Sequence, residues 1–326
     1  MVQTIDIEVV LNLIIFAMFF TIASTELMAA SAIIFKYKES EKKVFKFLIP
    51  IWEVTGTFFV FYVVNLEGLM PDVLPLLAYS FISYILILLI LYVLRNTLII
   101  SAENLWKRKN RIINRRLLYS AYAIVTFVLG AMIVMIYAAF IGGHGLNFNA
   151  ETFNLISFIT FLPDDGFIIG IAILFFGLAA VYYGLDVNPF LPFIVTTMGM
   201  LLSGISIFEM GDTNNSTLFI IPIIFTLSIP LLWMFNKTKN IAENKLVFQG
   251  LLSISIFFLA YSQYPYLLGK NLLITSVLNN SAMQTQMFYA TLIGGAILLV
   301  LTYFFFDIYF GNSQNENQEP IAEGEN

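Results

Sequence analysis

Positive charge is confined to three short stretches of this chain, and long apolar runs separate those stretches. Fifteen of the sixteen Lys and Arg residues lie in 36–46, 95–116 and 237–245, with Lys270 as the exception. Positive charge collects on the cytoplasmic side of membrane proteins. The pattern therefore predicts three cytoplasmic loops between membrane spans, and it sets the number and the direction of the spans together.

The composition favours a membrane protein built of helices. The chain is 59% hydrophobic and 11% charged, whereas a soluble domain is about 25% charged. The apolar runs are continuous and do not alternate with polar residues, as the strands of a membrane barrel would. The absence of cysteine excludes disulfides, thiolate metal sites and iron–sulfur clusters. We therefore predict an all-α polytopic membrane protein, and the net charge of −5 gives no reason to expect a nucleic-acid partner.

Nine runs are long enough to span a bilayer, which takes about 20 apolar residues. The first eight residues contain no Lys or Arg, so the first run should remain as a span and not be cleaved as a signal peptide. With the first basic stretch inside, the N-terminus lies outside and the C-terminus is cytoplasmic, in the plasma membrane. The predicted spans are 8–34, 47–66, 73–94, 117–141, 166–184, 189–209, 217–235, 247–267 and 284–310.

Two four-helix bundles and a ninth helix fit these spans. Within a transmembrane domain of residues 1–310, the first bundle would be 1–141 and the second 166–267. They would be joined by an external loop at 142–165 and followed by the ninth helix at 284–310. Residues 311–326 are polar and acidic, which predicts a disordered cytoplasmic tail.

Two carboxylates lie inside predicted spans. Glu26 is placed roughly 12 Å and Glu53 about 9 Å from the cytoplasmic ends of two antiparallel neighbours, at 1.5 Å per residue. A carboxylate in a span costs about 2.5–3.5 kcal/mol on insertion scales, so it usually faces the bundle interior and has a function. With the hydroxyls of Thr25, Thr55 and Thr57 nearby, the pair could carry protons inward from the cytoplasm. Alternatively, each Glu is neutral and hydrogen-bonds a neighbouring helix.

His144 is the only histidine and lies in the predicted external loop. Haem and metal sites usually have more ligands than one histidine. The sequence therefore predicts neither haem ligands nor a metal site on this chain.

Three segments resemble subunit II of the cytochrome bd-type quinol oxidases. TELMAASAI at 25–33 is similar to that family's Thr-Asp-Gly-Phe-Asp-type segment, with Glu26 at the acidic position. PIWEVTG at 50–56 resembles its His-Trp-Asp-Gly-Asn motif, with Trp52 and Glu53 matching the tryptophan and the acid. YPYLL at 264–268, followed by the run to residue 310, is similar to its closing segment.

The chain departs from the family pattern in the second segment and in both acids. Ile51 replaces the histidine, Val54 and Thr55 replace Gly-Asn, and both acids are Glu where Asp is usual. These departures concern the residues of the proton route, and they suggest a divergent, archaeal-type member of the family.

The resemblance implies a haem-free subunit of two four-helix bundles and a peripheral helix. It would pair as a heterodimer with a haem-bearing subunit I, and a small accessory subunit is a further candidate partner. The complex would oxidise membrane quinol and reduce oxygen to water, with no active site on this chain alone. Protons would come from the cytoplasm, with Glu53 matching the acid that lines one route, Glu26 as a second station, and Trp52, Thr25, Thr55 and Thr57 in support.

Two other classes fit the same residues. One is a haem-free membrane anchor of another quinone-linked complex. The other is a proton-coupled secondary transporter, although such proteins tend to show Gly- or Pro-broken spans at matched positions of two halves. A neighbouring gene for a multi-span protein with several His and Met residues would favour the oxidase.

Overall fold

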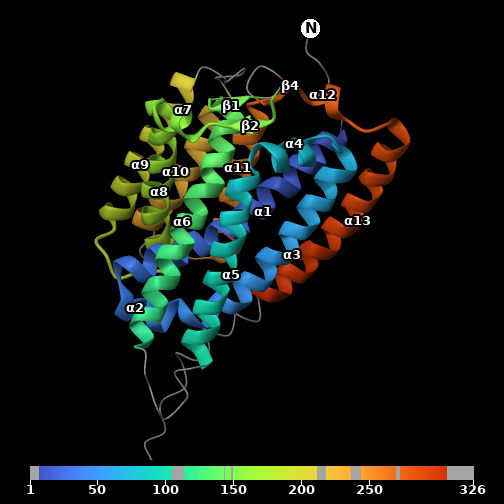
Figure 1. Ribbon diagram of the computed structural model, residues 1–326. Coiled ribbons are helices and arrows are strands. Elements are labelled where there is room, and N and C mark those ends of the chain that lie inside the picture. Colours follow the sequence, from blue (N-terminus) through green and yellow to red (C-terminus); the bar gives the residue numbers. More distant parts are fainter. Residues whose placement is uncertain are drawn as a thin grey trace, which may run out of the picture.

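The computed structural model describes residues 7–104, 114–142, 144–147, 150–210, 218–235, 244–268 and 272–306. This part of the chain is almost wholly helical (Figure 1). The long helices are α1 (Ile7–Phe35), α3 (Phe45–Leu69), α5 (Ile82–Asn104), α6 (Arg115–Gly142), α8 (Leu162–Tyr182), α9 (Phe190–Met210), α10 (Ile220–Phe235), α11 (Lys245–Tyr261) and α13 (Ser281–Phe306). The short helices are α2 (Tyr37–Lys43), α4 (Val73–Ser80), α7 (Leu155–Ile159) and α12 (Ile274–Val277). Two small hairpins pair β1 (Leu146–Asn147) with β2 (Thr152–Phe153) and β3 (Tyr266–Leu268) with β4 (Leu272–Leu273).

Every predicted apolar run contains a helix. Among the described residues, α1, α5, α6, α8, α9 and α13 are long and apolar enough to cross a membrane. The pair formed by α3 from Pro50 onward and α4 would add a seventh span, although the two are bent by 115° at the break between them. The helices α10 and α11 are apolar but shorter, with 16 and 17 residues. The chain is thus an all-α multi-pass membrane protein, as predicted.

The prediction was wrong about where the third run begins and ends. Residues 73–94 do not form one span, because the helix breaks at Phe81 into α4 and α5. The helix α5 also continues to Asn104, so Arg95 is helical and does not open the loop that was predicted to start there. A charged residue marks a helix end only when it is solvated, and Arg95 is 2% exposed.

Part of the predicted external loop forms regular structure. The hairpin β1–β2 and the helix α7 lie within 142–165, and α8 already begins at Leu162. Asn154 caps α7, accepting hydrogen bonds from the backbone of Ile156 and Ser157 at 3.0 and 3.1 Å. Pro163 lies in the first turn of α8, where a missing N–H costs nothing. The predicted tail at 311–326 lies beyond the described part of the chain, and the division into two bundles stays a prediction.

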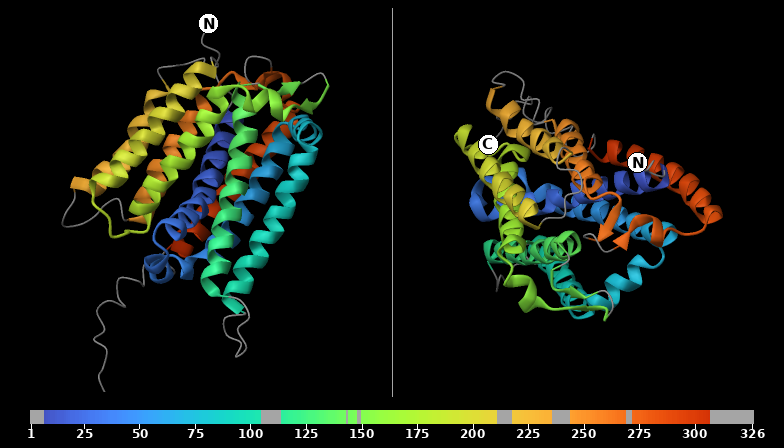
Figure 2. Two further views of the ribbon diagram at one scale, coloured as in Figure 1. Left: turned by 60° about the vertical axis from the view of Figure 1, so that its left-hand side comes forward. Right: turned by 90° about the horizontal axis from the view of Figure 1, so that it is seen from above.

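The helix α1 lies at the centre of the molecule and packs against α3, α6, α8, α11 and α13 (Figure 2). Small side chains, among them the fully buried Ala29, Ala30 and Ala32, let these neighbours approach it closely. Its buried Thr21 and Ser24 donate to carbonyl oxygens of the same helix, each at 2.6 Å. The first span is therefore an interior helix, whereas α13 lies at the edge and packs mainly against α1 and α3.

The helices α8 and α9 pack backbone to backbone through glycines. A Cβ added at Gly170 would lie 2.6 Å from the backbone nitrogen of Ser203, and one at Gly199 would meet the backbone of Leu174. Another at Gly177 would lie 2.8 Å from the backbone nitrogen of Thr196. Such close approach is a common way for helices to associate in lipid, where van der Waals packing drives association.

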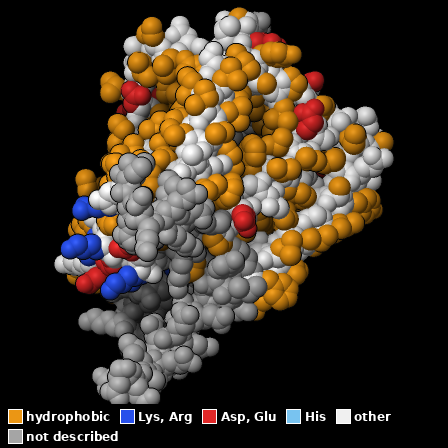
Figure 3. All heavy atoms as spheres, turned by 60° about the horizontal axis from the view of Figure 1, so that its bottom comes forward, with side chains coloured by type: hydrophobic (Ala, Val, Ile, Leu, Met, Phe, Trp, Pro, Cys, Tyr) orange, Lys and Arg blue, Asp and Glu red, His pale blue; other side chains and the backbone are white. Residues whose placement is uncertain are grey.

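Charge and irregular structure lie at opposite ends of the helices. One end holds α2 with its lysines, and we call it the basic end; the other holds the hairpins, α7 and α12, and we call it the hairpin end (Figure 1). Figure 3, which looks toward the basic end, shows the visible Lys and Arg gathered at the lower left with some Asp and Glu beside them, while other acidic side chains are scattered over the mostly hydrophobic coloured surface. This separation fits the predicted grouping of the basic loops on one side.

A polar cluster at the basic end joins α2 to the turn between α8 and α9. The Glu39 carboxylate lies 2.9 Å from the Lys43 ammonium and accepts a hydrogen bond from the backbone of Asp186 at 2.7 Å. Lys36 and Lys43 donate to the backbone carbonyls of Asp186 and Gly184. Partial burial alone would raise the pKa of Glu39, but the lysines and the Asp186 N–H together lower it.

Candidate functional site

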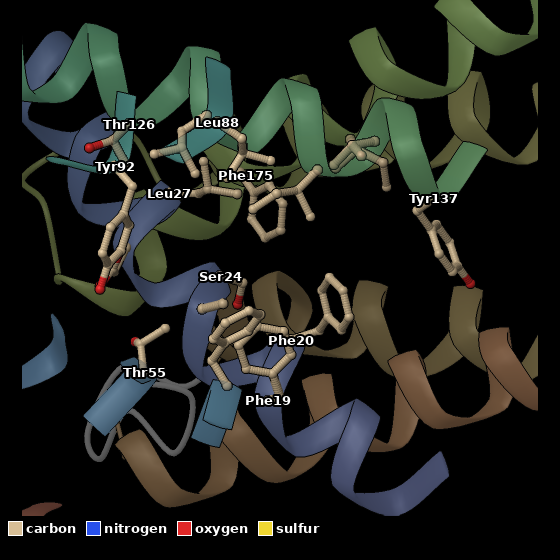
Figure 4. Close-up of a pocket in the computed structure, with 18 of the residues that line it drawn as sticks. Phe19, Phe20, Ser24, Leu27, Thr55, Leu88, Tyr92, Thr126, Tyr137 and Phe175 are labelled. Carbon is tan, nitrogen blue, oxygen red and sulfur yellow. The ribbon is translucent and has the colours of Figure 1, made fainter. Parts of the chain in front are cut away.

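A cavity of about 600 Å³ lies among α1, α3, α5, α6, α8 and α11. In Figure 4, Ser24, Phe19 and Phe20 of α1 line one wall, and Leu88 and Tyr92 of α5 face them with Thr126 and Tyr137 of α6. Aromatic and aliphatic side chains form most of the lining, with a few polar groups at defined places. A site of this size and lining is suited to a largely apolar guest or to a short chain of water molecules.

An ion pair between two helices forms part of the cavity wall. Arg95 of α5 pairs with Glu26 of α1, and their side chains are 3% and 12% exposed, respectively. Arg95 also donates to the side chain of Asn96 at 2.8 Å. Because each charge neutralises the other, the two charged groups can be tolerated inside the helical bundle.

Aromatic residues enclose the guanidinium of Arg95. Its central carbon lies 5.7 Å from the ring centroid of Tyr92 and 5.8 Å from that of Tyr122. The indole Nε1 of Trp52 donates to the Tyr92 hydroxyl at 3.1 Å, which ties α3 to α5 beside the pair. These contacts hold Arg95 in one position. Arg95 must be fixed in this way if it is to orient Glu26.

The predicted site residues separate into two groups. Glu26, Trp52 and Thr55 line the cavity. Glu53 and Thr57 are exposed on a different face of α3, where the Thr57 hydroxyl donates to the backbone carbonyl of Glu53 at 3.1 Å. The structure thus places only one of the two predicted carboxylates against the cavity.

Thr25 belongs to neither group. It is 2% exposed, and its hydroxyl donates to the Ile22 carbonyl at 2.6 Å. Its own backbone carbonyl accepts a hydrogen bond from the Tyr183 hydroxyl at 3.2 Å. Thr25 therefore joins α1 to the end of α8. The predicted hydroxyls do not form one cluster around both acids.

Arg95 is the site residue that the sequence analysis missed. It was counted with the basic stretch 95–116, although eleven residues without Lys or Arg separate it from Lys107. That gap, NTLIISAENLW, is the signal that could have placed Arg95 inside the helix. Among the described residues, no group of three or more His, Asp or Glu side chains could hold a metal ion.

Comparison with known proteins gives matches to solved structures and none to sequence families or curated sequences. No protein-family model and no curated protein sequence matches the chain. Among solved structures, a chain of the bd oxidase from Geobacillus thermodenitrificans has a TM-score of 0.66 with this protein at 17% sequence identity. The match covers 94% of this chain and 98% of that chain. At such low identity the likeness establishes the fold, and we conclude that this protein has a bd oxidase-like fold.

Proposed function

We propose that this chain is the haem-free subunit II of a cytochrome bd-type quinol oxidase. One observation carries the proposal: two of the three segments that resemble the family, 25–33 and 50–56, contribute Glu26, Trp52 and Thr55 to one cavity. These segments were recognised from sequence alone, and they come together in a fold like that of a bd oxidase chain. The complex would oxidise membrane quinol and reduce oxygen to water, with the haems in the partner subunit I.

Glu53 supports the existence of that partner. Its side chain is exposed on a helix that the sequence places in the membrane. A carboxylate facing hydrocarbon is costly, and such residues almost always face protein or water. The face of α3 that carries Glu53 and Thr57 would therefore be covered by subunit I in the heterodimer. Glu53 would then lie at the subunit boundary, where it could pass protons to the partner.

Glu26 and Arg95 give the proton path a second, interior station. The residues lie toward the basic end of α1 and α5, which the charge pattern assigns to the cytoplasm. Arg95 would hold Glu26 in place, and a water chain in the cavity would bring protons to it. In this scheme the chain itself performs no redox step, and its residues only bind, orient and exchange protons.

The proposal is tested first by purification. The tagged chain is extracted gently from its native membrane, and a reduced-minus-oxidised optical spectrum is recorded with identification of the co-purifying chains. Haem bands together with one multi-span partner support the oxidase. Iron–sulfur or molybdenum subunits would support another quinone-linked complex, and purification without haem or partner would support a secondary transporter.

Turnover of the intact complex then tests the proton path. Glu53→Leu and Glu26→Leu should each slow quinol-driven oxygen consumption, and the double variant should slow it further. Glu67→Gln is a matched control, because Glu67 is also an exposed carboxylate of α3 and lies near the hairpin end of that helix. Wild-type turnover in the intact double variant would exclude the path.

A further inference from the structure

Two side chains whose buried polar atoms lack a partner among the described residues meet at the hairpin end, where α6 ends and α8 begins. They are His144, two residues beyond the end of α6, and Asp164, in the first turn of α8. A Cβ built on Gly142 would lie 3.2 Å from the Asp164 Oδ1 atom and 3.2 Å from the His144 Nδ1 atom. Both atoms therefore face the same small space beside Gly142.

Three buried polar atoms of these two side chains lack a hydrogen-bond partner in the described part of the chain. Asp164 is fully buried, and both of its carboxylate oxygens lack a partner. The buried Nδ1 atom of His144 also lacks one, and its ring stacks on Phe161 with the centroids 3.6 Å apart. A buried carboxylate without any partner is destabilising, so an additional species in this space would stabilise the folded protein.

The surrounding chemistry favours a cation. A carboxylate oxygen and an imidazole nitrogen are common ligands of transition metals. Met210, which is 5% exposed, has its Cγ atom 3.5 Å from the same point beside Gly142, and its thioether is a further soft ligand close by. Oxygen, nitrogen and sulfur ligands together suit Zn²⁺ better than the oxygen-seeking Mg²⁺ or Ca²⁺.

We propose that His144 and Asp164 bind a divalent transition metal of the Zn²⁺ class, with Met210 beside it and water completing the coordination. The single histidine in the sequence predicts no metal site, because the burial of Asp164 beside His144 has no signal in the sequence. Such a site would join the ends of α6, α8 and α9, since Met210 is the last residue of α9. The proposal does not depend on the oxidase function.

Zn²⁺ binding to the purified full-length protein tests the proposal. The protein carries an affinity tag without histidine, and binding is measured by titration calorimetry and by metal analysis after desalting. His144→Phe keeps an aromatic ring that can stack on Phe161, and Asp164→Asn keeps the shape of the side chain. Each should weaken Zn²⁺ binding by at least about tenfold, since even changes beyond the direct ligands cost 10–100-fold.

Asp165→Asn is the matched control, because it removes the same charge from the same helical turn without facing the space beside Gly142. It should bind Zn²⁺ nearly as tightly as the wild-type protein. Thermal unfolding without metal shows whether each variant is folded. If Asp164→Asn is not folded, the comparison of His144→Phe with the wild type alone tests the site. Absence of Zn²⁺ binding to the wild type, or equal binding to the wild type and to folded His144→Phe, would overturn the proposal.

Discussion

Arg95 of α5 forms an ion pair with Glu26 of α1 in the interior of the helical bundle. Both residues lie within apolar helices, and the pair shares a cavity wall with Trp52 and Tyr92. Partners that neutralise each other are tolerated in such surroundings, whereas a single charge is not. This pair therefore connects two helices that are distant in sequence. The effect on stability of replacing Glu26 or Arg95 should depend on whether the other residue is present.

Removal of Arg95 alone should destabilise the protein strongly. In Arg95→Leu the Glu26 carboxylate remains without its counter-charge, and breaking a buried pair in this way costs about 3–5 kcal/mol. The double variant Glu26→Leu, Arg95→Leu removes both charges and should recover much of that loss. Unfolding in detergent, measured for both single variants and the double variant, gives the coupling energy. Additive losses in the three variants would show that the pair is not coupled.

A methyl group at Gly199 should disrupt the contact of α8 with α9. The added Cβ would meet the backbone of Leu174, which cannot move aside as a flexible side chain can. Overpacking of this kind costs about 1–3 kcal/mol. Gly250→Ala in α11 is the control, since a Cβ there meets nothing within 4 Å. We expect Gly199→Ala to lower the unfolding temperature and Gly250→Ala to leave it unchanged or raise it slightly.

The cluster around Glu39 should make stability depend on pH at the acidic end. The lysines and the Asp186 N–H outweigh partial burial and lower the folded-state pKa of Glu39 below its ordinary value of 4.5. The stabilisation is therefore complete above pH 4.5 and is lost as the pH falls through the folded-state pKa. Glu39→Gln should abolish this acid-induced loss of stability. At pH 7 it should lower the free energy of unfolding by less than about 1 kcal/mol, since the group is near the surface.

Glu41→Gln provides the comparison for that measurement. Glu41 is also an acid of α2, but it pairs with Arg115 at 2.9 Å and not with the turn between α8 and α9. Unfolding temperatures are measured between pH 3 and pH 7. Glu41→Gln should lose stability as the pH falls to the same extent as the wild-type protein. An unchanged pH profile in Glu39→Gln would show that the cluster does not contribute.

The lack of cysteine allows a direct test of orientation in the membrane. Lys42→Cys places a thiol at the basic end and Ala150→Cys places one at the hairpin end, and both positions are exposed. A membrane-impermeant maleimide added to intact cells should label Ala150→Cys and leave Lys42→Cys unlabelled until the cells are opened. The reverse result would invert the predicted orientation.

The sequence predicted the helices well because apolar run length is a local property. Each of the nine runs contains a helix, and their basic connections lie at one end of the molecule as far as the chain is described. The break at Phe81 was missed because neither Gly nor Pro occupies that position. Arg95 was misplaced because a buried cation and a loop cation look alike in sequence until the partner is known.

Side-chain direction was the harder part of the site. Glu26 and Glu53 were predicted at similar depth, but depth along a helix does not say which face each side chain occupies. The orientation of Glu53 away from the cavity depends on how α3 is rotated against α1 and α5, which is a property of packing. Burial of Asp164 had no local signal either, because acidic residues at the start of a helix are ordinarily solvated.

The central position of α1 bears on how the protein is made. The helix α1 contacts α11 and α13, which follow it far along the chain and are therefore synthesised much later. Its polar and small-residue faces therefore cannot be fully enclosed until α11 and α13 have entered the membrane. Chains that stop before α11 would expose these faces to lipid and to other proteins. Insertion of α11 and α13 is thus the step that encloses α1, and we expect quality control to recognise chains truncated before α11 by an uncovered α1.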